Sequence, residues 1–438
     1  MRSIALRGLL VTAGLACTAA CGGGGGGNTA PKPVTLEMDT WWASMSELAP
    51  IQSVIQIHEK AYPNVTVNVV TASSQAQMDT DVTNRFAAGT PPAALQANLG
   101  GNALQFSAGA LGLGTPSWKG SFQSTILDTL TQDGKLIGVP LGLTRQNVTY
   151  WNLQVLSTLP APLNAIPKGV DGFKTWVTGV AAAGYTHPLC FGFKDGWVNA
   201  HILFEDIVPA IAGAAYSKTY WSGQDAAGAN SAQIAAALDF AAQYVFPYLT
   251  SDTPTLAMGP GIDRLMNKST TASPLSAPPT MDQTCIMTAM GDWAGPQLVQ
   301  TDGYVAQKDF DASGWPGAEN LVDFGGDAMV AAATAGDTMD VTNLFNTLAS
   351  EQGQLAFATL KGEIPARNLT AADAMTLPYL IKINMDALAS TAPLAGFKVI
   401  ANSNYDMNTL YTKAQNFFLS GDKTALVAFL AQNYASLM

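Results

Sequence analysis

The sequence predicts an α/β fold, and three neighbouring segments carry the prediction. Residues 34–38 alternate between apolar and polar side chains as a strand does, whereas the apolar residues of 51–62 recur with helical spacing. Residues 65–70 alternate again, and Pro63 and Asn64 break the chain just before them. This strand, helix and strand order is the β-α-β unit from which parallel sheets are built.

The same order of elements continues along the chain. We expect further strands at residues 94–97, 147–151 (which residues 135–140 lead into), 189–193, 285–290 and 328–332. We expect helices at residues 78–88, 200–214, 231–248, 341–361, 407–420 and 423–437. Proline and glycine clusters predict surface loops at residues 251–260 and 273–279. With 438 residues, of which 48% are hydrophobic, the chain can form two or more domains.

The N-terminal residues have the pattern of a bacterial lipoprotein signal. Basic residues precede an apolar stretch at 9–16, and two alanines stand before Cys21, so residues 1–20 are predicted to be removed. The apolar stretch is too short to span a bilayer. Cys21 would then carry the lipid, and residues 21–33, with six consecutive glycines, would form a flexible tether. Thr18 stands where a larger aliphatic residue is usual, and an ordinary cleaved signal with an incidental cysteine is the alternative.

The composition limits the partners of the protein. The net charge of −11 and the absence of a basic stripe argue against nucleic acid. Only 12% of the residues are charged, and neutral polar residues are plentiful. Such a surface suits an exported protein that recognises neutral polar molecules.

Tryptophan and polar residues come together where predicted strands end. Trp41 and Trp42 follow the first strand, Trp197 follows the strand through 189–193, and Asp292 and Trp293 follow the strand through 285–290. These strand ends are where α/β folds bind ligands. An indole can cover the C–H face of a sugar ring, while carboxylates accept hydrogen bonds from its hydroxyls. Any single tryptophan is more often a core residue.

The sequence gives weaker evidence for an enzyme than for a binding protein. None of His58, His187 and His201 stands at metal-ligand spacing from a carboxylate or a cysteine, so we expect each to be structural or solvated, with no metal or cofactor. The sequence contains no Gly-x-Ser-x-Gly elbow. Asp292 and Asp327 could still pair as the acid and nucleophile of a glycan-processing hydrolase, which is the alternative function.

Several collinear motifs resemble a known family. They are Trp41-Trp42 with Glu47, and the segments 61–67, 88–96, 133–140, 145–147, 194–197, 290–294 and 361–367. Together they resemble the extracellular solute-binding proteins of ABC sugar importers, with a closer likeness to the glucose/mannose-binding branch. The likeness covers nearly the whole chain after the tether.

The resemblance implies a periplasmic-binding-protein-like fold of two α/β lobes with a multi-crossing hinge and a ligand cleft between them. The N-terminal lobe would comprise residues 34–145 and 326–362, and the C-terminal lobe residues 146–325 and 363–438. It also implies a monomer without enzymatic activity that is anchored outside the cell or in the periplasm. The protein would deliver a neutral sugar to an ABC permease, or hand its bound state to a signalling receptor.

The resemblance assigns site roles as well. Trp41 or Trp42 and Trp293 would flank the sugar, and four polar residues would bind its hydroxyls: Glu47, Gln96, Asp327 and Lys361. Asn98, Trp197 and Asp292 complete the expected site. Trp118 lies outside the motifs, and we expect its replacement by alanine to leave binding almost unchanged.

Two departures from the branch affect the choice of sugar. Asn98 and Ala395 stand where the branch has histidines, which puts glucose itself in doubt, because an unsatisfied buried hydroxyl costs about 1–3 kcal/mol. The resemblance also places the strands of Cys190 and Cys285 side by side in one lobe. An oxidising compartment would permit a disulfide there, and two buried free thiols fit the sequence equally well.

Overall fold

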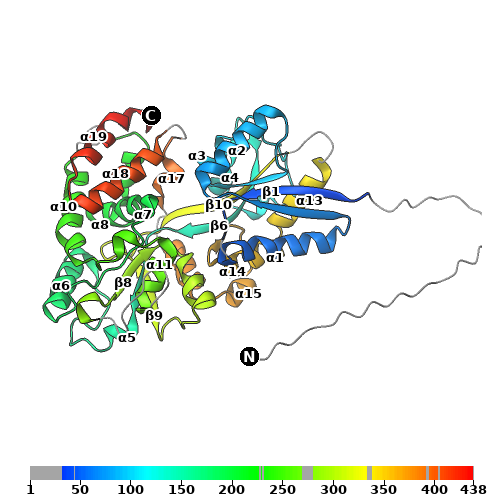
Figure 1. Cartoon of the computed structure of the whole chain (residues 1–438). Helices are drawn as coiled ribbons and strands as arrows, with labels where there is room; N and C mark the ends of the chain where they lie inside the picture. The colour runs from blue at the N-terminus through cyan, green and yellow to red at the C-terminus, as the bar shows by residue number, and fades with distance from the viewer. Residues whose placement is uncertain are drawn as a thin grey trace, which may run out of the picture.

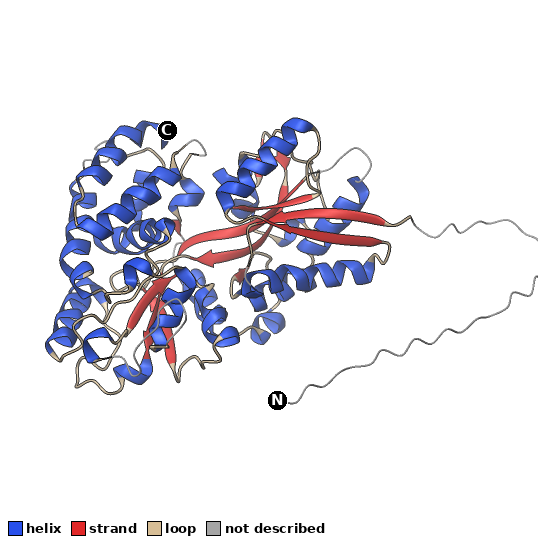
Figure 2. Ribbon diagram, viewed as in Figure 1, coloured by secondary structure: helices blue, strands red, loops and turns tan. Residues whose placement is uncertain are grey.

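The computed structural model describes residues 32–43, 45–225, 228, 231–268, 280–332, 338–390, 394–402 and 405–437. The chain forms two lobes side by side, and long strands run from one into the other (Figures 1 and 2). The predicted α/β fold is confirmed. Cys21 and the predicted loop at 273–279 lie outside the described residues.

The first lobe is built on a mixed sheet with the strand order β11-β6-β10-β3-β1-β2, and β12 pairs with β10. Strand β1 runs parallel to β2 and β3, whereas β10 runs antiparallel to β3 and β6. The strands are β1 (Val34–Thr40), β2 (Val65–Thr71), β3 (Ala94–Asn98), β6 (Gly138–Arg145), β10 (Asp323–Ala331), β11 (Ile364–Pro365) and β12 (Leu394–Ala395). Every residue of β6 is buried, which explains its mainly apolar sequence.

Helices cover both faces of this sheet (Figure 1). They are α1 (Met45–Ala61), α2 (Gln75–Ala88), α3 (Gly101–Leu104), α4 (Ser124–Asp128), α13 (Thr338–Ala349) and α14 (Glu351–Lys361), with a small hairpin of β4 (Thr131–Gln132) and β5 (Lys135–Leu136). The single helix predicted at 341–361 is wrong. Ser350 is extended and its side chain accepts a hydrogen bond from the Gly353 N–H, so a new helix begins there.

The second lobe contains a three-stranded antiparallel sheet of β8 (Met287–Met290), β7 (Val148–Asn152) and β9 (Phe310–Gly314), with β7 in the centre. Helices surround it (Figure 2). In chain order they are α5 (Leu153–Leu156), α6 (Gly169–Ala182), α7 (Gly196–His201), the π-helix η2 (Ile202–Ile207), α8 (Val208–Ala212), α9 (Ala214–Trp221), α10 (Ala232–Tyr244), α11 (Met258–Asp263), α12 (Ala294–Pro296), the π-helix η8 (Gln297–Thr301), α16 (Tyr379–Ser390), α17 (Phe397–Ile400), α18 (Met407–Ser420) and α19 (Thr424–Asn433). The short helix α15 (Ala371–Thr376) is drawn below α1 and α14 in Figure 1.

Two further predictions for this lobe are wrong. Residues 189–193 form no strand: only Leu189 makes bridges, and the Phe193 and Lys194 N–H groups donate to the carbonyls of Thr253 and Leu256 in a neighbouring loop segment. The helix predicted at 200–214 is several pieces, because it widens into η2 and stops at Gly213, whose φ of +89° is unfavourable for other residues.

Each lobe has its own hydrophobic core. One buried cluster draws on residues 36–143 and 328–366, and the other on residues 148–321 and 380–437. Cys190 and Cys285 form a disulfide in the second cluster, with their Cα atoms 5.7 Å apart. In the described part of the chain, no helix has the length and apolar character needed to cross a membrane.

Candidate functional site between the lobes

Lys361 is the centre of a charged cluster in the first lobe. It is the last residue of α14, which Gly362 terminates with a φ of +83°. The Lys361 Nζ lies 4.0 Å from Asp327 Oδ2, 3.9 Å from Glu363 Oε1 and 5.0 Å from the centroid of the Trp42 ring. The structure therefore brings Lys361, Asp327 and Trp42 together, as the resemblance implies.

Burial and the neighbouring charges shift the pKa values of Lys361 and Glu363. Burial alone would lower the pKa of Lys361, but Asp327, Glu363, Glu47 and Asp292 outweigh burial and raise it, which keeps the ammonium charged. Burial raises the pKa of Glu363 well above its usual value, and Asp327 adds to the effect. A raised pKa favours the neutral carboxylic acid, which can donate a hydrogen bond as well as accept one.

The two adjacent tryptophans have different environments. Trp42 is only 1% exposed and packs on Phe357, with ring centroids 5.5 Å apart. Trp41 is partly exposed. Gln96 lies beside them on β3, where its Oε1 accepts hydrogen bonds from the Thr40 hydroxyl and the Trp41 N–H. Trp41 is thus the indole of the pair with accessible surface, while Trp42 supports Lys361 from the core.

Asn98 and Asp327 lie opposite each other where β3 and β10 pair. The Asn98 N–H donates to Asn102 Oδ1 at 2.8 Å, and its side-chain amide donates to Gln75 Oε1 at 3.2 Å. Asn98 is therefore held at the edge of the cluster by neighbours on α2 and α3.

The second lobe contributes an aromatic cluster. The Trp293 ring centroid lies 6.3 Å from that of Trp197 and 5.7 Å from that of His201. Gly291 makes this arrangement possible, because a Cβ at that position would lie 1.9 Å from the Trp293 ring. Burial lowers the pKa of His201 to about 3, so the imidazole is neutral. Lys398 completes the cluster, with its Nζ 5.0 Å from the centroid of the Trp197 ring.

Asp292 joins the site to the crossing between the lobes. Its Oδ2 accepts a hydrogen bond of 2.8 Å from the Arg145 N–H, and its own N–H donates to the Arg145 carbonyl. Burial raises the pKa of Asp292 well above the usual range, opposed by the Arg145 N–H and by the charge of Lys361. Asp292 therefore holds the last residue of β6 in place, and it also interacts electrostatically with Lys361 of the first lobe.

Sequence reasoning gave no role to Lys398 or Glu363, and it treated His201 as structural or solvated. Glu363 lies within the 361–367 motif, whereas no motif surrounds Lys398. Only the fold brings Lys398 from the C-terminal region next to Trp197.

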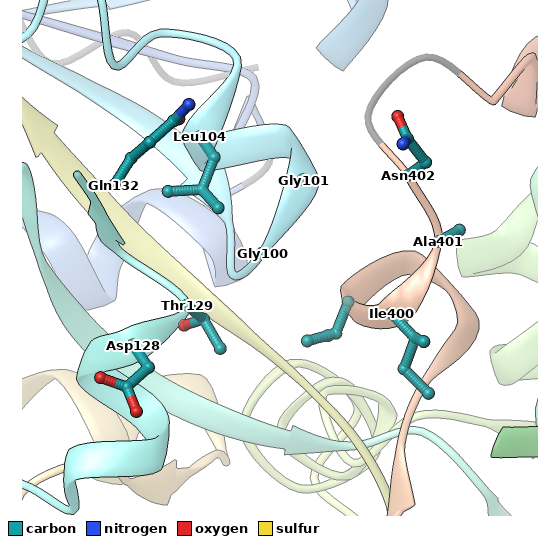
Figure 3. A pocket seen from close by; sticks show the side chains of 10 residues that line it. Gly100, Gly101, Leu104, Asp128, Thr129, Gln132, Ile400, Ala401 and Asn402 are labelled. Atoms are coloured by element: carbon teal, nitrogen blue, oxygen red, sulfur yellow. The ribbon is translucent and has the colours of Figure 1, made fainter. Parts of the chain in front are cut away.

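Two surface hollows lie outside these clusters. One of about 550 Å³ lies where residues 399–402 face Gly100, Gly101 and Thr129 across the two lobes (Figure 3). The other, of about 690 Å³, lies on the first lobe and includes Asp39 and Arg85. Neither hollow includes a residue predicted to bind the sugar. Within the described ranges, no group of three or more His, Cys, Asp or Glu residues is placed to hold a metal ion.

Two α/β lobes that present charged and aromatic groups to the junction between them define a class of proteins that bind a small ligand between lobes. Residues 53–377 match the model of the bacterial extracellular solute-binding protein family. The chain belongs to this family. Its members bind solutes and are not enzymes, so the hydrolase alternative with Asp292 and Asp327 is set aside.

Two relatives are similar to the chain in sequence, and one solved structure is similar to it in fold. An ABC transporter extracellular-binding protein of Pyrococcus horikoshii is 23% identical over 399 residues, which cover 85% of this chain and 81% of the relative. The xylose/arabinose-binding protein XacG of Haloferax volcanii is 19% identical over 76% of this chain and 69% of its own length. A solved chitin oligosaccharide binding protein has a TM-score of 0.74 and 18% identity, covering 92% of this chain and 99% of that one.

Proposed function

We propose that the protein captures a neutral sugar, either a monosaccharide or a short oligosaccharide, between its lobes and delivers it to an ABC permease. One observation carries the proposal: polar groups of the first lobe and aromatic groups of the second lie on either side of Asp292, where the chain passes between the lobes. The polar groups are Lys361 and Asp327, and the aromatic groups are Trp197 and Trp293. Hydroxyls need paired donors and acceptors, and a sugar ring needs a flat apolar surface.

The charge around the site supports a neutral ligand. Two ammonium groups, Lys361 and Lys398, interact electrostatically with five carboxyl groups: Glu47, Glu205, Asp292, Asp327 and Glu363. Burial raises the pKa values of Glu205, Asp292 and Glu363, which favours neutral carboxyl groups that exchange hydrogen bonds with hydroxyls. The names of two similar proteins, one binding xylose or arabinose and the other chitin oligosaccharides, also favour a saccharide.

The choice of sugar is part of the proposal. The likeness to the glucose/mannose-binding branch supports a pyranose, but Asn98 and Ala395 replace two histidines of that branch. The Asn98 amide is already used by Gln75. We therefore propose a neutral sugar other than glucose as the physiological ligand.

The N-terminal signal and the division into lobes also belong to the proposal. Residues 1–20 would be removed, Cys21 lipidated, and residues 21–33 would tether the protein to the membrane. The lobes would be divided at residues 145/146, 325/326 and 362/363. The protein would act as a monomer, and a sensor role beside a signalling receptor is the alternative to import.

A calorimetric screen of neutral saccharides tests the proposal, with Trp293→Ala as the site variant. We expect at least one saccharide to bind one site per chain, and Trp293→Ala to weaken it about ten-fold or more. Trp118 is not the neutral control that its sequence position suggests, because it is 7% exposed and its indole donates to Asn346 Oδ1. The partly exposed Tyr304 is a better aromatic control. No binding by any neutral saccharide, or equal losses in Trp293→Ala and Tyr304→Ala, would contradict the proposal.

A further inference from the structure

The ammonium of Lys398 lies among aromatic rings of the second lobe. Its Nζ lies 5.0 Å from the centroid of the Trp197 ring, 5.9 Å from that of Tyr411 and 6.0 Å from that of Phe397, so three aromatic rings surround the ammonium. No hydrogen bond or ion pair joins Lys398 to any residue in the described part of the chain. An ammonium group has three donors, and leaving them unsatisfied in a partly buried place is unfavourable.

The fold fixes the position of Lys398. The Gly396 N–H donates to the Phe324 carbonyl of β10 at 2.7 Å, which ties the start of α17 to a strand of the crossing. A Cβ at Gly396 would lie 2.7 Å from Glu205 Oε2 and 2.8 Å from Asp323 Oδ1, so glycine permits this close approach. Lys398 comes two residues later and is directed by this anchor toward Trp197.

Charges from both lobes act on Lys398. Burial lowers the pKa of Lys398, and the charges of Glu205 and Asp327 oppose this effect. Asp327 belongs to the Lys361 cluster of the first lobe, and Trp197 neighbours Trp293. The backbone of α17 also meets the first lobe, because a Cβ at Gly100 would lie only 2.5 Å from the Val399 carbonyl oxygen. Lys398, one residue before Val399, therefore lies close to both halves of the candidate site.

We propose that Lys398 is a specificity-determining residue that donates hydrogen bonds from the second lobe to a hydroxyl of the bound sugar. This inference rests on the proposed function and adds a contact that neither the sequence motifs nor the family match assigns. A hydroxyl suits this position because it accepts from the ammonium while donating to a carboxylate such as Asp327.

Calorimetry with Lys398→Met tests the inference. Methionine keeps the length of the side chain and its contact with Trp197 but removes the charge and the donors. We expect the affinity for the saccharide that binds the wild-type protein to fall about ten- to a hundred-fold. Lys308→Met is the matched control, because Lys308 is an exposed residue of the same lobe, and it should leave the affinity unchanged.

A second measurement uses the wild-type protein and does not depend on the folding of a variant. Acetic anhydride acetylates accessible lysines, and peptide mass spectrometry measures the extent at each one. Saturating saccharide should reduce acetylation of Lys398 several-fold and leave Lys308 unchanged. If the wild-type protein binds a saccharide but Lys398 is not protected, or if Lys398→Met and Lys308→Met bind equally, the inference is wrong. If no saccharide binds the wild-type protein, it is the proposed function that fails.

Discussion

Replacing Gly291 by alanine should displace Trp293 and weaken sugar binding without unfolding the protein. A Cβ at Gly291 would lie 1.9 Å from the Trp293 ring, whereas carbon atoms prefer a separation of about 3.5 Å. The ring must therefore move by about 1.5 Å. Trp293 is partly exposed, so it can move toward the space between the lobes rather than into the core.

The magnitude follows from two effects. Overpacking of this kind costs about 1–3 kcal/mol of unfolding free energy. The displaced indole loses its contact with the sugar, and an aromatic contact of this type contributes about 0.5–1.5 kcal/mol beyond its buried area. We expect a fall in affinity of about ten-fold, and a fall in melting temperature of a few degrees, of the order of 2–4 °C per kcal/mol.

Calorimetric titration and a thermal melt of the unliganded protein measure the two effects separately. Gly259→Ala is the matched control, because a Cβ there meets its nearest atoms, those of the Gln297 amide, at 3.7 Å and 3.8 Å, an ordinary contact. Gly259 lies in α11 of the same lobe. If Gly291→Ala binds sugar like Gly259→Ala, then Trp293 does not contact the ligand in the way that we infer.

Three further predictions concern the disulfide, a partly buried carboxyl group and the anchor. The denatured protein freed of its leader should show no reactive thiol from Cys190 and Cys285 without reductant, and breaking their bond should cost about 2–4 kcal/mol; two reactive thiols would rule the bond out. Burial raises the pKa of Asp79 to about 6 in the folded protein, although hydrogen bonds from Gln105, Asn102 and Gln75 lower it. The folded protein therefore binds this proton more tightly than the unfolded chain, whose pKa is 3.8. The resulting gain in the free energy of unfolding is complete below pH 3.8 and is lost as the pH rises through 6. Urea titrations from pH 4 to pH 7 should show that Asp79→Asn removes this part of the pH dependence, while the exposed Asp81→Asn keeps it; equal slopes would contradict the assignment. Cys21→Ser should release the protein from membranes or leave an uncleaved precursor, and native protein that fractionates as a soluble species would contradict lipidation.

Much of the fold could be predicted because local signals agree with it. The helix predicted at 407–420 has those bounds because Asp406 caps its first turn and Gly421 ends it in the left-handed conformation. The break at Ser350 has a capping signal as well, but the apolar periodicity continues across it and hides the boundary. Residues 189–193 look like a strand because they are buried, yet only the first two meet β8, at Met287, and the N–H groups of Phe193 and Lys194 donate to carbonyls outside any strand. Periodicity reports burial and cannot identify the hydrogen-bond partner.

The candidate site could be predicted only where a motif marked it. The segments of Trp41, Trp293 and Lys361 have neighbours typical of the family, so the resemblance could name them. Lys398 has no such neighbours, and its position depends on Gly396 pairing with Phe324. The burial of Trp42 depends on its packing against Phe357, more than 300 residues away in sequence, which the local pattern does not show.

A crystal structure of the protein with the saccharide that binds it most tightly tests the central claim most directly. We predict that the sugar lies between the lobes, with hydroxyls within hydrogen-bond distance of Asp327 or Lys361 and one ring face against Trp293. A sugar bound elsewhere, for example in the hollow beside Asp39 and Arg85 on the first lobe, would contradict the account.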